Sequence, residues 1–150
     1  MRFLFYDAIT SIEKARSIEG VKTFSLSEEF LRSHYTRCAY VPGVLFTEAM
    51  AQLLGWLITY SSDFKVSAAL ILLEGVVVPP HMRPGFRAEI RGEIISSSRR
   101  DTMGRGEIRV EGERIAWVDR ILYGHFESIA PGELKRMYEY YSGNKIVHED

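Results

Sequence analysis

Residues 44–58 form an apolar run that contains a single charged residue, Glu48. The run is rich in good helix formers, so it predicts a long helix. A helix on the surface of a globular protein carries charged side chains over about half of its circumference, and this run does not. Pro42 and Gly43 precede it and predict a sharp turn at its start. We therefore expect a helix at about residues 43–61 that other structure encloses on most sides.

The second half of the chain has the alternation typical of β-strands. In residues 86–94, apolar or glycine residues alternate with charged ones, which predicts one buried and one solvated strand face. Residues 105–111 repeat this pattern. Residues 114–124 are apolar on both faces, as in an interior strand, and the Gly-Glu pair at 112–113 predicts a hairpin turn before them.

The other predicted elements rest on weaker signals. A continuous apolar run at 67–78 predicts another buried strand, and the two prolines that follow mark its end. Further predictions are strands at about 3–11 and 13–25, a short helix at about 27–32 capped by Ser27, and a last helix from Pro131 to about Tyr141.

These elements predict an α+β fold. An antiparallel sheet can leave its charged face to solvent, but its apolar face needs a cover. The simplest solution is an antiparallel sheet wrapped around one long central helix at about 43–61. A chain of 150 residues suits one domain. We assign residues 1–126 to that domain and residues 127–150 to a C-terminal helical extension and tail.

Charge and cysteine content exclude several classes of protein. With 19 basic and 20 acidic residues the net charge is −1, so the broad basic field of a nucleic-acid binder is absent. The single cysteine, Cys38, cannot form an internal disulfide or a multi-thiolate metal site. No run approaches the ~20 apolar residues of a membrane span, and the N-terminal apolar run stops at Asp7, too early for a signal peptide. We expect a cytoplasmic protein with no metal, no nucleic-acid partner and no membrane span.

Residues 34–52 carry the candidate chemistry. Pro-Gly-Val-Leu at 42–45 and Glu-Ala-Met-Ala-Gln at 48–52 match, residue for residue, a signature in which a histidine precedes the glutamate. His34 stands at the position of that histidine, with the same spacing to the glutamate. In these motifs the chain resembles the hot-dog-fold 3-hydroxyacyl-acyl-carrier-protein dehydratases of fatty-acid synthesis. Weaker similarity extends over residues 2–124.

The resemblance implies a hot-dog fold and a hydro-lyase. The enzyme would convert (3R)-hydroxyacyl thioesters of acyl carrier protein to trans-2-enoyl thioesters. It implies His34 as base, Glu48 as the group that handles the hydroxyl, and Gly43, Val44 and Gln52 as substrate-binding residues. It implies no metal or redox cofactor, and the phosphopantetheine arm belongs to the substrate. In the family the His and Glu of one site come from different subunits, so a homodimer with one continuous sheet is implied, with further assembly left open.

These residue types suit the chemistry. Dehydration removes a proton from C2 and hydroxide from C3, and a neutral imidazole accepts a proton at neutral pH. An apolar environment disfavours the charged form of a carboxyl, which makes Glu48 the candidate proton donor. The backbone N–H of Gly43 lies at the positive end of the predicted helix, where it lacks an intrahelical partner and can polarise a carbonyl. Gln52, one turn after Glu48, can hydrogen-bond it.

Several alternatives stay open at this point. Ser33, Tyr35 and Thr36 replace the Gly, Phe and Pro of the family around His34, which keeps open a non-catalytic acyl-binding subunit. An acyl-thioester hydrolase with the same fold is another alternative, although the His–Glu spacing argues against it. A hydratase acting on coenzyme A esters would use the same catalyst in reverse. Trp56 suits either an acyl tunnel or simple core packing.

Overall fold

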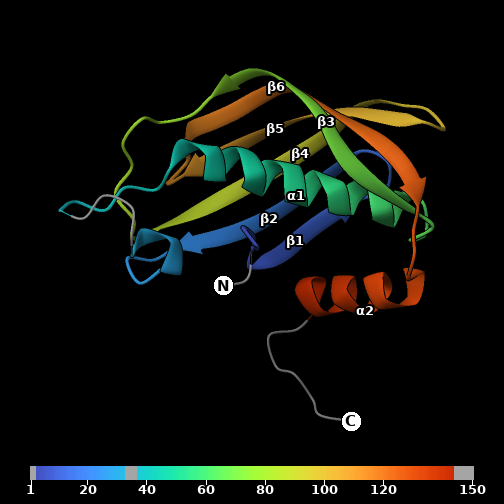
Figure 1. Ribbon diagram of the computed structural model, residues 1–150, viewed down its shortest axis with the longest axis horizontal. Helices are drawn as coiled ribbons and strands as arrows, with labels where there is room; N and C mark the ends of the chain where they lie inside the picture. Colours follow the sequence, from blue (N-terminus) through green and yellow to red (C-terminus); the bar gives the residue numbers. More distant parts are fainter. Residues whose placement is uncertain (1–2, 33–36, 144–150) are drawn as a thin grey trace, which may run out of the picture.

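The computed structural model describes residues 3–32 and 37–143, which form one antiparallel sheet with helix α1 lying across one face (Figure 1). The strand order is β1-β2-β4-β5-β6-β3, and every neighbouring pair is antiparallel. The predicted architecture, a sheet wrapped around one central helix, is confirmed. The elements are β1 (Ala8–Glu13), β2 (Ser17–Phe24), the 3-10 helix η1 (Glu29–Leu31), α1 (Gly43–Ser61), β3 (Val66–Val77), β4 (Phe86–Ser97), β5 (Asp101–Val110), β6 (Glu113–Glu127) and α2 (Pro131–Ser142).

Helix α1 has the predicted bounds and is buried as predicted. It follows Pro42, whose extended backbone caps the N-terminus. It stops at Ser61 because Asp63 and Phe64 both adopt positive φ angles, 53° and 64°, which a helix cannot continue. The Phe64 N–H then donates to the Thr59 carbonyl at 2.9 Å and satisfies an end of the helix.

The sheet lies close to α1 because glycines face the helix. A Cβ on Gly20 would lie 2.9 Å from Leu53, and one on Gly104 would lie 2.4 Å from Leu54. Gly92 and Gly106 make similar close approaches to side chains of α1. These glycines occupy the apolar phase of the strand alternation. The missing side chains are therefore the space into which the large residues of α1 fit.

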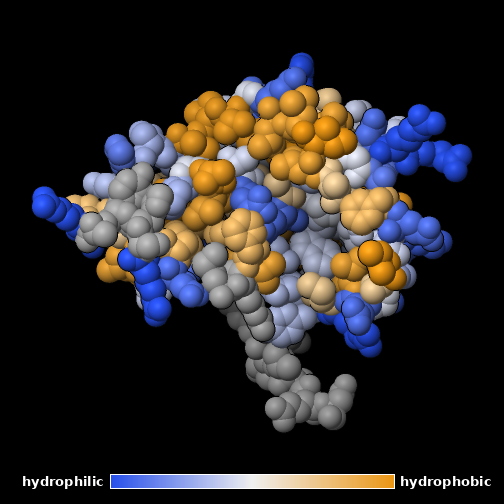
Figure 2. Space-filling view, in the orientation of Figure 1, coloured by the Kyte–Doolittle hydropathy of each residue, from blue (hydrophilic) through white to orange (hydrophobic). Residues whose placement is uncertain are grey.

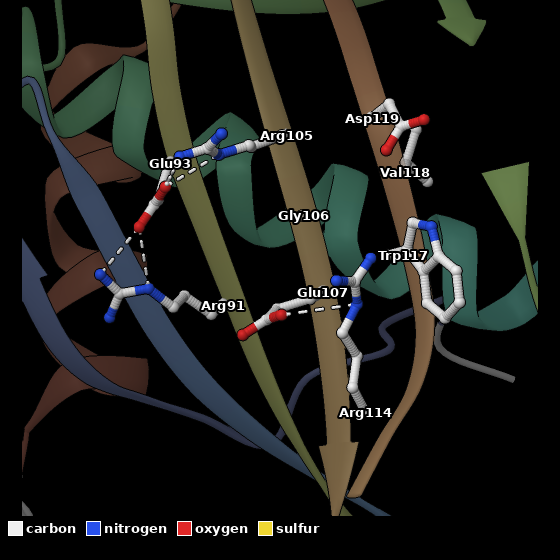
Figure 3. Close-up of a pocket in the computed structure, with 9 residues that line it drawn as sticks. All are labelled: Arg91, Glu93, Arg105, Gly106, Glu107, Arg114, Trp117, Val118 and Asp119. Carbon is white, nitrogen blue, oxygen red and sulfur yellow. Dashed lines mark hydrogen bonds and ion pairs between the residues drawn. The ribbon is translucent and has the colours of Figure 1, made fainter. Parts of the chain in front are cut away.

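The opposite face of the sheet carries a network of ion pairs (Figure 3). Arg91 on β4 contacts Glu19 on β2 and Glu93 on its own strand, and Arg105 on β5 donates to Glu93 at 2.8 Å. Opposite charges face each other across the strands, which stabilises the pairing modestly. The solvated strand face that the alternation predicts is present, and its charges are paired with one another. Glu107 on β5 contacts Arg109 and Arg114 in the same way.

Acid should weaken this network at Glu93. Hydrogen bonds from Arg105, the larger effect, and from Arg91 hold the pKa of the Glu93 carboxyl below its usual range. Its contribution to stability is therefore present above the pKa of the unfolded chain and is lost as pH falls through the folded value. Between about pH 6 and pH 3 we expect the free energy of unfolding to fall further in the native protein than in Glu93→Gln. The difference between the two losses should be about 1 kcal/mol or less. Urea melts at both pH values measure this, with Glu127→Gln, an exposed carboxyl at the end of β6, as control. An equal acid loss in native protein and Glu93→Gln would contradict the prediction.

The strand predicted at 67–78 was expected to be buried. In the single chain β3 is exposed, so that prediction is wrong for the single chain. It lies at the edge of the sheet, and its apolar side chains are exposed; Figure 2 shows apolar side chains gathered in the region where Figure 1 places β3. Leu70, Ile71, Leu72, Val76 and Val77 are each between 41% and 62% exposed. An apolar run on both faces of a strand indicates burial, but the described residues provide a neighbour on one side only.

Smaller corrections concern turns and the N-terminal region. The expected helix at 27–32 is only the 3-10 turn Glu29–Leu31, and Ser27 does not cap it, because its hydroxyl bonds that of Ser25. The hairpin turn before β6 falls one residue earlier than predicted, at Glu111 and Gly112, which both have positive φ. The first two strands are shorter than predicted. None of the helices in the described part of the chain has the length and apolar character that a bilayer span requires.

Helix α2 has the predicted position and packs through aromatic rings. Tyr138 lies 5.0 Å from the Tyr60 ring and 5.6 Å from that of Phe64, at the C-terminal end of α1. Tyr141 makes an edge contact with Tyr6 at 5.0 Å. The helix thus covers the region between α1 and β1 (Figure 1). The division of the chain at residue 126 stays a prediction.

Candidate active site

One face of α1 lines a pocket of about 380 Å³ between the helix, the N-terminal segment and the β6–β3 side of the sheet. Glu48, Ala51, Gln52, Gly55 and Trp56 follow each other at helical spacing, so they share this face. The remaining walls are Leu4, Tyr6, Ala68, Leu70 and Tyr123, from the N-terminal segment, β3 and β6. The lining is mainly apolar with a few polar groups, as in sites that bind small molecules.

The carboxylate of Glu48 is held by Gln52 inside this pocket. The Gln52 amide Nε2 donates to Glu48 Oε1 at 2.9 Å, so the expected hydrogen bond is present. The same nitrogen donates to the Phe3 carbonyl at 2.9 Å, and Gln52 Oε1 accepts from the Phe5 N–H at 2.9 Å. Three bonds therefore orient the amide, and the amide in turn orients the carboxylate. No residue pattern indicated that the N-terminal segment provides this support.

Tyr123 on β6 is a pocket residue that sequence reasoning missed. Its hydroxyl donates to the Ala51 carbonyl at 2.6 Å, which ties β6 to the middle of α1. Burial raises the pKa of Tyr123 well above its usual range, and the nearby charge of Glu48 raises it further. Tyr123 is therefore neutral at any ordinary pH and acts as a hydrogen-bond donor.

Gly43 and Val44 lie at the start of α1, outside the lining of this pocket. Gly43 packs against the connection after β3, where a Cβ would lie only 2.6 Å from Val78 Cγ2, so packing alone requires a glycine there. Val44 is 68% exposed. The described residues thus bring Glu48 and Gln52 together but leave Gly43 and Val44 more than one turn away. His34 lies outside the described residues.

A second hollow, of about 290 Å³, lies on the outer face of the sheet and offers less chemistry. Figure 3 shows that its side chains come from β4, β5 and β6, with α1 behind the sheet. Of its three carboxylates, Glu93 and Glu107 are paired with arginines, while Asp119 on β6 lies apart from them, and Arg114 lies 3.9 Å over the Trp117 ring. No group of three or more potential metal ligands exists among the described residues. The pocket of Glu48 is therefore the candidate active site.

Comparisons with known proteins agree with the geometry. The fold is the hot-dog fold: the dehydratase heterocomplex ApeI:P from Xenorhabdus doucetiae superposes with a TM-score of 0.66 at 14% identity, covering 90% of both chains. The thioesterase HI1161 from Haemophilus influenzae superposes with a TM-score of 0.61 at 11% identity, covering 80% of this chain and 78% of that one. Likeness at such low identity defines the fold alone.

Sequence similarity defines the family. Residues 1–119 match the model of the FabA-like domain, and the chain belongs to that family. It is also 29% identical, over 120 residues, to the 3-hydroxyacyl-acyl-carrier-protein dehydratase FabZ of Bacillus subtilis strain 168. That match covers 78% of this chain and 84% of the relative. Helix α2 lies beyond the residues that match the family.

Proposed function

We propose that the protein dehydrates (3R)-hydroxyacyl thioesters of acyl carrier protein to trans-2-enoyl thioesters. The observation that carries this proposal is the Glu48 carboxyl group, which lies in a largely apolar pocket and accepts a hydrogen bond of 2.9 Å from the Gln52 amide. Membership of the FabA-like family and similarity to a FabZ dehydratase support it. The solvated ion pairs of the outer sheet face offer no comparable site.

The reaction needs a base and an acid. A base takes the proton from C2, the C3–oxygen bond breaks, and the departing hydroxyl leaves as water after it receives a proton. We assign the base to His34 and the proton donor to Glu48. The N–H of Gly43 at the start of α1 is our candidate donor to the thioester carbonyl, whose oxygen gains charge as C2 loses its proton. The side chains supply both proton transfers, so we propose no cofactor.

We further propose that the substrate reaches the pocket on a carrier protein. Acyl carrier proteins are acidic, and Arg32 and Arg37, which flank the His34 segment, are both exposed. Coenzyme A thioesters have the same pantetheine arm, so both carriers belong in the assay. A cytoplasmic location stays a prediction.

Assays with both carriers test the proposed reaction. The enoyl thioester is conjugated and the hydroxyacyl thioester is not, so ultraviolet absorbance follows their interconversion directly. We expect the native protein to interconvert the two and to release no free thiol. Thiol release without enoyl formation would instead identify a hydrolase. Binding of the thioesters without either reaction would identify an acyl-binding subunit.

Assembly as a homodimer through β3 is the remaining part of the proposal. The apolar residues of β3 are exposed on an edge strand, where pairing with a second copy would extend the sheet. Pairing of β3 with β3 would also bring two copies of the pocket close together, since Ala68 and Leu70 of β3 line it.

A charge on β3 should disrupt the dimer. Ile71, 62% exposed in the single chain, would meet the partner, and a buried lysine without a counter-charge is costly. We expect Ile71→Lys to raise the dissociation constant by at least about tenfold. Light scattering after gel filtration over a dilution series measures this. Ile129→Lys, at a site 95% exposed between β6 and α2, is the matched control. A dimer equally tight in all three proteins would exclude β3 as the interface.

A further inference from the structure

Gly55 is a glycine in the middle of α1 that packing does not require. Glycine is unfavourable inside a helix, so its presence there needs a reason. The sheet glycines have one, because a Cβ on Gly104 would lie 2.4 Å from Leu54. A Cβ on Gly55 would meet nothing within 4 Å. Gly55 lines the pocket of Glu48, so the space left by its missing side chain belongs to the pocket.

The pocket has a firm wall next to Gly55. The Trp56 indole N–H donates to the Tyr6 hydroxyl at 2.7 Å, and both residues are buried. Helix α2 supports this pair from behind: the Tyr138 ring lies 6.0 Å from Trp56, and Tyr141 contacts Tyr6. Burial raises the pKa of Tyr6, which keeps its hydroxyl neutral. The wall is therefore fixed by a hydrogen bond and by aromatic contacts on its far side.

Gly55 and this wall lie at a useful distance from the reacting group. Gly55 comes seven residues after Glu48 on the same face of α1, a rise of roughly 10 Å along the helix axis. If C3 of the substrate sits at the Glu48 carboxylate, an alkyl chain directed along α1 reaches Gly55 and then meets Trp56 and Tyr6.

We propose that Gly55, together with the Tyr6–Trp56 wall, sets the length of acyl chain that the pocket accepts. The inference rests on the proposed function, because it places the reacting carbons at Glu48. The missing side chain at Gly55 makes room for the distal methylenes of a medium-length chain. The wall, backed by α2, excludes longer chains.

Binding of unreactive ligands tests this without requiring turnover. Pantetheine thioethers with butyl, dodecyl and hexadecyl chains share the arm of both carriers and cannot react, and calorimetry measures their affinities. A single methylene in an apolar pocket changes selectivity roughly 10–200-fold. We expect Gly55→Ala to weaken dodecyl binding relative to butyl binding by about tenfold. Trp56→Phe removes the bond to Tyr6 and part of the wall, so it should strengthen hexadecyl binding.

The control and the contrary outcomes are defined by the structure. Gly132 on α2 is exposed, and a Cβ there also meets nothing within 4 Å, so Gly132→Ala should leave the dodecyl-to-butyl ratio unchanged. Gly55→Ala should also melt at a higher temperature, because alanine favours helix. An unchanged ratio in Gly55→Ala, or no binding of any chain to the native protein, overturns the inference. Dissociation of the dimer by Gly55→Ala would also overturn it, because Gly55 would then serve subunit contact.

Failure of the proposed reaction is distinguishable from failure of this inference. If native protein turns over no thioester but Gly55→Ala shifts the binding ratio, the dehydratase assignment is wrong and the length rule holds. If turnover occurs and Gly55→Ala does not change the binding ratio, the dehydratase assignment holds and the inference on chain length is wrong.

Discussion

Glu48→Gln is expected to lower turnover of 3-hydroxyacyl thioesters by about 10²–10⁴-fold, the usual contribution of a positioned general acid or base. The substitution keeps the shape of the side chain and an oxygen that accepts from Gln52, so the bond of 2.9 Å to the Gln52 amide can persist. What is lost is the proton that the departing hydroxyl needs. Steady-state kinetics with the enoyl chromophore measures the effect.

His34→Ala provides the companion variant. If His34 and Glu48 act on one substrate molecule, each single variant loses most of the rate, and the double variant is little worse than either. Independent roles would instead give losses that multiply. Circular dichroism and gel filtration must show that all variants fold and assemble as the native protein does. Native-like turnover in Glu48→Gln would remove the carboxylate from the mechanism.

The burial of the central helix could be predicted because its sequence is almost free of charged residues. A run of residues 44–58 with one charge is incompatible with a solvated helix, and the structure encloses α1 as expected. The strand alternation likewise identified which face of the sheet is charged. In contrast, β3 was predicted buried because an apolar pattern indicates that side chains lose contact with water, not which chain covers them. The pattern of apolar residues therefore does not distinguish an interior strand from an edge strand that pairs with a second subunit.

The candidate site was predictable only where it lies within one motif. Glu48 and Gln52 are one turn apart, so their hydrogen bond follows from helix geometry. Phe3, Phe5 and Tyr6 join the site through contacts some 47 to 50 residues away in sequence, which no local pattern encodes. For Gly43 the sequence analysis considered only a role in substrate binding. The structure adds a packing role, because a Cβ at this position would lie 2.6 Å from Val78 Cγ2.

The second large effect concerns stability and follows from the glycines beneath α1. Gly104→Ala is expected to lower the free energy of unfolding by about 1–3 kcal/mol, the usual cost of overpacking a core. A Cβ there would lie 2.4 Å from Leu54 Cδ2 and 2.7 Å from the Glu93 carbonyl oxygen. The backbone contact cannot be relieved by a rotamer change, so the strands must move. Gly132→Ala, at an open helical position, is the matched control and should change stability little.

A double-mutant cycle with Leu54 separates the two contacts. Leu54 is fully buried, so Leu54→Ala alone should cost about 2–5 kcal/mol through the cavity it leaves. In Gly104→Ala/Leu54→Ala the new methyl group enters part of that cavity, and one of the two clashes disappears. We therefore expect the double variant to be more stable than the sum of the single losses predicts, by roughly 0.5–3 kcal/mol. Urea melts of the four proteins at a fixed concentration measure this coupling. Strict additivity would mean that the Glu93 backbone alone opposes a side chain at Gly104, and that Leu54 does not require the glycine beneath it.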